Sequence, residues 1–110
     1  MNMTASQAQT FEEGSASVIA AWIIRYIEEM KGIPSSAIPR EAEFASLGLE
    51  STIALAMTGD LSDWLETHID PMAPYQHPTI DALSRALAAE PEVQARLRTL
   101  GVFVAPTWTR

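Results

Sequence analysis

Apolar residues recur at steps of three and four in separate stretches of this 110-residue chain, and no stretch alternates as a half-buried strand would. The first stretch predicts a helix from Ser15, which Ser15 or Ser17 can cap and which Gly32 followed by Pro34 ends. Its charged residues lie on the opposite side. The apolar side consists of Ile19, Trp22, Ile23, Tyr26, Ile27 and Met30.

A second helix is predicted from Ser51 to about Thr67, with Thr52, Asp60, Asp63 and Glu66 on its polar side. Gly59 inside it costs about 1 kcal/mol relative to alanine, so packing must support this helix. Its apolar stripe consists of Ala54, Met57, Leu61, Trp64 and Leu65.

After the second helix, the chain predicts shorter helices. Three prolines between Asp70 and Pro78 leave room for at most one short helical turn. Thr79 is a suitable N-cap for the helix that follows, and Asp81 suits its first turn. The apolar residues of that helix are Ile80, Leu83 and Leu87. After Pro91, a further helix is predicted from Val93, Leu97 and Leu100, with Gly101 as its stop.

Between the first two helices, Gly32 to Glu50 form a loop of nearly twenty residues with no sustained period. A loop of that length is unusual in a compact domain unless it is functional or held by its own apolar residues. We expect it to be pinned to the core by Ile33, Ile38, Phe44, Leu47 and Leu49.

These elements predict an all-α fold: a four-helix bundle of three principal helices and one short helix, with an extra C-terminal helix. The length suits a single domain. We expect residues 1–14 to be a mobile leader, 15–90 the folded domain, and 91–110 a helix followed by a tail or linker. The last residues, "VFVAPTWTR", are apolar without a helical period, and are either packed on the bundle or used on a partner.

The net charge of −7 is unevenly distributed, because Arg40 is the only basic residue between Lys31 and Arg85. Such an acidic surface repels nucleic acid and anionic lipid, and attracts proteins with basic patches, although it can also serve solubility alone. No apolar run is long enough to cross a bilayer and no signal peptide is recognised, so a cytoplasmic monomer is expected. The chain has no cysteine, which excludes disulfides and thiolate metal sites.

The sequence offers few residues for catalysis or metal binding. His68 and His77 lie nine residues apart, outside any spacing typical of a metal site or catalytic triad. Asp60 and Asp63 are three apart on a helix and are interpreted as a solvated pair or a docking site. No glycine-rich phosphate loop is present. We therefore predict no catalytic residue, no metal ligand and no enzymatic activity.

Ser51 has two interpretations. As an N-cap it would accept a backbone hydrogen bond worth about 1 kcal/mol, and the residues alone favour this interpretation. The same place also suits a covalently attached phosphodiester, which would lie at the positive end of the helix dipole beside unpaired N–H groups.

Two motifs in order resemble the acyl carrier proteins, with the related peptidyl carriers, of fatty-acid, polyketide and nonribosomal-peptide synthesis. They are "F-x-x-L-G-L-E-S" at Phe44–Ser51 and "Y-Q-H-P-T-I-D-A-L" at Tyr75–Leu83. The resemblance spans about Val18 to Leu87. It implies that Ser51 carries 4'-phosphopantetheine, transferred from coenzyme A by a magnesium-dependent phosphopantetheinyl transferase, and that the resulting thiol carries acyl groups as thioesters.

The resemblance also implies partners: the transferase, an acyl-loading enzyme, and a ketosynthase or other synthase domains. "GDLSDWL", Gly59 to Leu65, is similar to carriers that receive fatty acyl groups from fatty acyl-AMP ligases. We expect partners to dock on a surface of the second helix, called the docking surface below. It comprises Glu50, Thr52, Leu55, Ala56, Asp60, Asp63 and Glu66.

Glu50 and Thr52 depart from the family, which usually has aspartate and leucine at these places. Both flank Ser51 and bear on which transferase accepts the chain. Three alternatives remain open at this point: an unmodified helical interaction module, a peptidyl carrier of a nonribosomal peptide synthetase, and an enzyme whose catalytic group is not recognised.

Overall fold

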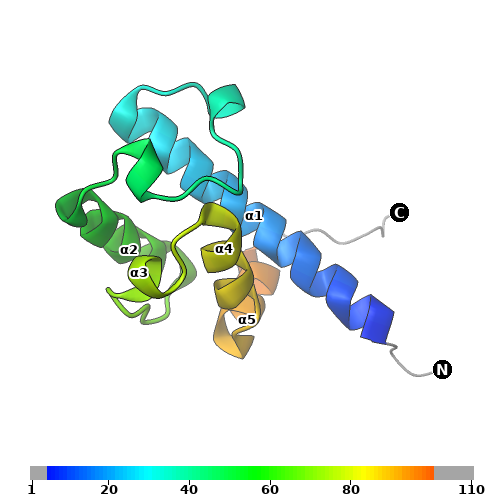
Figure 1. The fold of residues 1–110 in the computed structure, drawn as a ribbon. Coiled ribbons are helices and arrows are strands. Elements are labelled where there is room, and N and C mark those ends of the chain that lie inside the picture. The colour runs from blue at the N-terminus through cyan, green and yellow to red at the C-terminus, as the bar shows by residue number, and fades with distance from the viewer. Residues whose placement is uncertain (1–4, 101–110) are drawn as a thin grey trace.

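The computed structural model describes residues 5–100, and the predicted all-α fold is confirmed there (Figure 1). Two 3-10 turns, Ser35–Ala37 and Ala45–Leu47, lie in the long loop. Within the described residues the only strand-like pairing is one antiparallel bridge between Glu43 and Thr79. The α-helices are α1 (Ala5–Lys31), α2 (Ser51–Leu65), α3 (Ala73–Gln76), α4 (Ile80–Ala88) and α5 (Pro91–Leu100).

Helix α1 starts ten residues earlier than predicted, at Ala5 rather than Ser15. The predicted start of this helix is therefore wrong, because residues 5–14 are helical. The expectation that residues 1–14 are mobile stays a prediction, and residues 1–4 lie outside the described part. The N-terminal turns of α1 project beyond the other helices (Figure 1). These residues contain no proline, and a helix that is already packed further along extends at little cost through alanine, glutamine and glutamate. An apolar stripe is not required for that extension.

The other end of α1 agrees with the prediction. Gly32 has a φ of +69° and donates its N–H to the carbonyl of Glu28 at 2.9 Å. This left-handed residue after the last turn ends the helix, and glycine adopts that conformation without steric cost.

One hydrophobic core joins all the longer helices. Helix α4 packs along α1, and α5 covers the end of the bundle (Figure 1). Trp22 on α1 is half-buried, and its ring stacks on those of Tyr26 and Trp64, with centroids 5.4 and 5.5 Å apart. Trp64 is thus at the rim of the core. The fully buried large side chains are Ile19, Ile23 and Ile27 of α1, Met57, Leu61 and Leu65 of α2, Ile80 and Leu83 of α4, and Val93 and Leu97 of α5.

The loop before α2 is pinned as predicted. Ile38, Phe44 and Leu49 are buried, and Ile33 and Leu47 pack partly buried against the same core. Backbone hydrogen bonds then attach the loop to the start of α4. They run from the N–H of Phe44 to the Pro78 carbonyl, of Ile80 to the Ala42 carbonyl, and of Asp81 to the Arg40 carbonyl.

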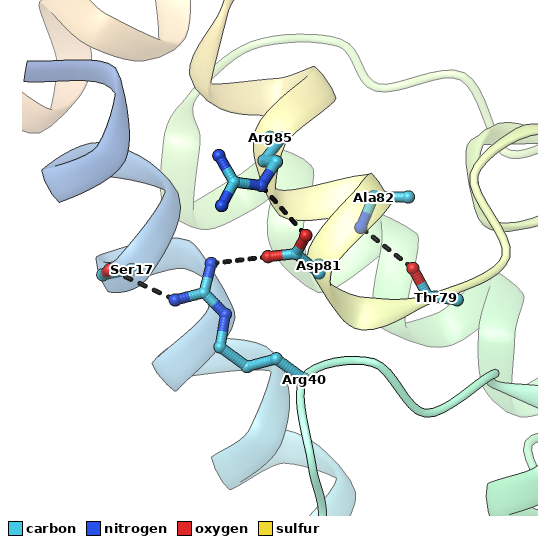
Figure 2. A network of polar contacts seen from close by, with 6 residues as sticks. All are labelled: Ser17, Arg40, Thr79, Asp81, Ala82 and Arg85. Carbon is cyan, nitrogen blue, oxygen red and sulfur yellow. Dashed lines mark hydrogen bonds and ion pairs between the residues drawn. The ribbon is translucent and has the colours of Figure 1, made fainter. Parts of the chain in front are cut away.

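A polar network fixes the same junction (Figure 2). Arg40 of the loop donates one hydrogen bond to Asp81 at 2.9 Å and another to Ser17 of α1 at 3.3 Å. Asp81 also accepts from Arg85 at 2.9 Å, one turn further along α4. Thr79 accepts from the Ala82 N–H at 3.0 Å, which confirms it as the N-cap of α4. One arginine thus joins the loop, α1 and α4.

No helix among residues 5–100 combines the length and apolar character that crossing a bilayer requires.

Candidate functional site

Ser51 is the first residue of α2, and the N-cap position before it belongs to Glu50. Glu50 has extended backbone angles, and its carbonyl accepts the N–H of Ala54 at 2.9 Å. An N-cap residue lies just before the helix, and its side chain accepts a hydrogen bond from a backbone N–H of the first turn. Ser51 is already part of the helix. The prediction that Ser51 caps α2 is therefore wrong.

The start of α2 has no side-chain cap at all. The Glu50 carboxylate makes no capping hydrogen bond, and the N–H groups of Ser51, Thr52 and Ile53 have no acceptor among residues 5–100. These donors point along the helix axis at its positive end. Ser51 itself is exposed, and none of the described residues hydrogen-bonds its hydroxyl.

This arrangement fits a phosphodiester attached to the Ser51 oxygen. The hydroxyl is accessible, and the unsatisfied N–H groups of the first turn are suitable donors to phosphate oxygens. The start of α2 would hold the attached group by these backbone donors and by the helix dipole, without a metal-binding cluster. Among the described residues no group of three metal-ligating side chains exists, and His68 and His77 lie in separate loops.

The turn that leads into Ser51 depends on Gly48, whose φ is +77°. The Lys31 side chain lies over this glycine: a Cβ added there would be 3.3 Å from Lys31 Cε and 3.4 Å from its Nζ. An ammonium group from the end of α1 therefore lies beside the loop, three residues before Ser51. Sequence reasoning missed this neighbour, since nothing in the spacing of Lys31 signals it.

Apolar side chains surround the start of α2. A cavity of about 150 Å3 lies between the loop, α2 and α3. Leu55, Met72 and Tyr75 are exposed large apolar side chains, with 56%, 53% and 52% of their surface accessible. The cavity is lined by Glu43, Phe44, Ala45, Leu49, Ala54, Pro74, Tyr75 and Pro78.

Every residue of the predicted docking surface is exposed, from Glu50 to Glu66. The acidic members differ in their surroundings, however. Burial, the negative charge of Asp60 and a hydrogen bond to it raise the pKa of Tyr26 on α1. Glu66 forms an ion pair with Arg96 of α5 at 3.0 Å. No ion pair or hydrogen bond of the Asp63 side chain is found within residues 5–100.

Arg96 is a second residue that sequence reasoning missed. Its Nε donates to the Trp64 carbonyl at 3.1 Å while its Nη2 pairs with Glu66, so it closes the C-terminal end of α2. The helical spacing of Val93, Leu97 and Leu100 predicted α5 correctly. It contained no information on which helix end the intervening arginine would reach.

Residues 21–87 match the family described as "Phosphopantetheine attachment site". The chain is 30% identical over 76 residues to acyl carrier protein TtuC of Teredinibacter turnerae, covering 69% of this chain and 87% of TtuC. It is 34% identical over 68 residues to one subunit of the phenolphthiocerol/phthiocerol polyketide synthase of Mycobacterium tuberculosis. That match covers 62% of this chain and only 4% of the synthase subunit.

A solved structure supports the same relationship. A free-standing peptidyl carrier protein from an uncharacterized secondary metabolic pathway of Acinetobacter baumannii superposes with a TM-score of 0.65 at 28% identity. The superposition covers 69% of this chain and 95% of that protein. The chain therefore belongs to the family of carrier proteins built around a phosphopantetheine attachment site, and its cofactor is covalently attached 4'-phosphopantetheine.

Proposed function

We propose that Ser51 is the attachment point and that the chain carries acyl intermediates as thioesters between enzymes of polyketide, lipid or lipopeptide biosynthesis. One observation carries this proposal. Ser51 presents an exposed hydroxyl on the first residue of α2, beside N–H groups that no described residue accepts. It also lies inside the range that matches the family, residues 21–87.

The contribution of such a carrier is delivery rather than catalysis. Attached phosphopantetheine supplies the thiol that this cysteine-free chain lacks. A tethered thioester reaches each partner's active site at a high effective concentration, which replaces a bimolecular encounter by an intramolecular one. The protein's own task is to present Ser51 and to be recognised. Gly48, the pinned loop and the open start of α2 serve the presentation.

The proposed partners are those that the resemblance to carrier proteins implies. A phosphopantetheinyl transferase with coenzyme A and magnesium modifies Ser51, and an acyl-loading enzyme, of the fatty acyl-AMP ligase type, charges the thiol. Ketosynthase or other synthase domains then receive the acyl group. The docking surface supports recognition by basic patches, because no basic residue lies between Arg40 and Arg85 in the sequence.

A second candidate is a peptidyl carrier of a nonribosomal peptide synthetase. The likeness to the free-standing peptidyl carrier favours it, at a TM-score of 0.65. The polyketide candidate has the support of the polyketide synthase match, in which the matched segment is a small part of a much longer protein. The two candidates share the attachment chemistry at Ser51 and differ in the group that is loaded.

The decisive experiment is to incubate the full chain with a broad-specificity phosphopantetheinyl transferase, coenzyme A and magnesium, and to measure the intact mass. We expect a gain of one phosphopantetheine that is absent in Ser51→Ala. Ser46→Ala is the matched control, because Ser46 is another exposed serine of the same loop region and should leave the gain intact. A chain that gains no mass with any competent transferase would instead be an unmodified interaction module.

A further inference from the structure

Helix α5 lies outside residues 21–87, the range that matches the carrier family, and is nevertheless part of the core. Val93 and Leu97 of α5 are fully buried in the same cluster as the side chains of α1, α2 and α4. Gln94 further donates to the Ala88 carbonyl at the end of α4, at 2.8 Å. These anchors place the rest of α5 at a defined position beside α2.

Arg96 uses that position to hold the C-terminal end of α2. It contacts two groups there, the Trp64 carbonyl at 3.1 Å and the Glu66 carboxylate at 3.0 Å. Among the described residues, Glu66 is the one non-glycine residue with a positive φ, at +50°. A guanidinium at this end of a helix also complements the negative end of its dipole. Arg96 is thus tied to α2 by geometry and by charge.

The consequence concerns the docking surface on which the proposed function relies. A basic side chain of a partner that approached Glu66 would meet a carboxylate already paired with an arginine, and would have to displace it. Only 22% of the Arg96 side chain is accessible, against 66% of the Glu66 side chain. The guanidinium is therefore well shielded and is additionally retained by the Trp64 carbonyl. Asp63, one turn earlier, has no such competitor among residues 5–100.

We propose that Arg96 is a specificity-determining residue, which withdraws Glu66 from the docking surface. A partner with a basic patch then reads the part of α2 that includes Asp63 and lies nearer to Ser51. This proposal rests on the proposed function for the identity of the partner, but the charge pattern itself can be measured without modification. By pairing with Glu66, Arg96 of α5 leaves fewer acidic side chains on the docking surface available to a partner than the sequence of α2 suggests.

The first test is an NMR titration of the full unmodified chain with a hexalysine peptide. In the unaltered protein, the amide signals around Asp63 should shift, and that of Glu66 should not. In Arg96→Gln the Glu66 signal should shift as well. Glutamine removes the charge and can still donate to the Trp64 carbonyl. Arg25→Gln is the control, since it changes the net charge equally but breaks an exposed ion pair with Glu29 on α1.

The second test compares two neutralised acids in transferase kinetics. Asp63→Asn should raise the KM for the carrier by about two- to fivefold, the range expected for one exposed charge pair, with kcat unchanged. In the Arg96→Gln background, where KM is expected to fall by a similar factor, Glu66→Gln should reverse that fall. A loss of packing alone would not lower KM.

Two results would overturn the proposal. The first is a hexalysine-induced shift of the Glu66 amide signal that is equal in the unaltered protein and in Arg96→Gln. The second is a shift of that signal that is equal in Arg25→Gln and in Arg96→Gln. Either result stands even if Ser51 is modified normally. Conversely, a chain that no transferase modifies contradicts the proposed function, while the hexalysine titration still decides the role of Arg96.

Discussion

The two ends of α2 differ in how their backbone groups are satisfied. At the start, Glu50 provides no side-chain cap and the first N–H groups lack acceptors among the described residues. At the end, Arg96 of α5 binds the Trp64 carbonyl, and Ser62 accepts the N–H groups of Thr67 and Ile69 with its carbonyl and its hydroxyl. One helix therefore has an open end and a closed end.

This difference separates function from stability within a single helix. Unsatisfied polar groups cost stability when they are buried, but at an exposed helix start they are hydrated and remain available to a ligand. The open end is where an attached phosphate would find donors. The closed end is where contacts with α5 and with the chain after α2 satisfy the backbone groups. Substitutions at the two ends should accordingly affect different measurements.

The largest effect is expected from the helix that closes α2. Leu97→Ala removes a fully buried side chain from α5 and should lower the free energy of unfolding by about 3 kcal/mol, as is typical for a large cavity. Urea denaturation measures this loss. The control is Leu55→Ala, the same change at an exposed site on α2, which should cost far less. A loss at Leu97 as small as that at Leu55 would mean that α5 does not close the bundle.

A smaller, opposite effect is expected at the open end. Glu50→Asp places a preferred N-cap residue before Ser51, and its shorter carboxylate can accept from the first-turn N–H groups. The free energy of unfolding should rise by about 0.5 to 1 kcal/mol. Glu50→Gln keeps the length of the side chain and should give no gain. If Glu50→Asp and Glu50→Gln have the same melting temperature, the first-turn N–H groups of α2 are not available to a side-chain cap.

The junction between the loop and α4, where Asp81 binds Arg40 and Arg85, should lose stability in acid. Hydrogen bonding by Arg85, with the positive charges of Arg85 and Arg40, lowers the pKa of Asp81 below its usual 3.8. Because the folded-state pKa is depressed, this stabilisation is present above about pH 4 and is lost as pH falls through the lowered pKa. The pairs are partly exposed, so the effect should stay below about 1 kcal/mol. Asp81→Asn should reduce the acid sensitivity of the melting temperature, and an unchanged pH profile would contradict this.

The smallest effect on stability is expected at the site itself. Ser51→Ala should change the free energy of unfolding by less than about 0.5 kcal/mol, because the hydroxyl is exposed and makes no hydrogen bond with the described residues. A helix cap would have cost about 1 kcal/mol on removal. Chemical denaturation of both proteins therefore separates an attachment site from a cap. A loss near 1 kcal/mol would restore the capping interpretation.

Much of the fold could be predicted because local signals agreed with tertiary packing. The proline-broken segment allowed one short helix, and α3 is that helix. Thr79 looked like a cap and is one. The end of α2 was predicted about two residues too late, and the start of α1 ten residues too late. Helix boundaries depend on end contacts and on propagation from packed turns, which periodicity does not report.

For the site, the motifs around Ser51 and the downstream "YQHPTI" were sufficient to predict the carrier family, which the comparisons confirm. The attachment to Ser51 and the docking surface stay predictions. The residues alone misjudged Ser51 as a cap, since serine before a helical pattern is a common cap and a shift of one position changes its role. Lys31 and Arg96 were missed because each acts on a segment distant in sequence.

The sequence by itself determined the helices, the pinned loop and the family, because apolar spacing, prolines and short motifs act over a few residues and are readable along the chain. Only the tertiary structure decided how the acidic face of α2 is presented. Whether Glu66 is available depends on an arginine thirty positions later in the chain, and only the packing of Val93 and Leu97 brings that arginine to the end of α2. An ion pair of this kind is a property of distance in space, which no local pattern encodes.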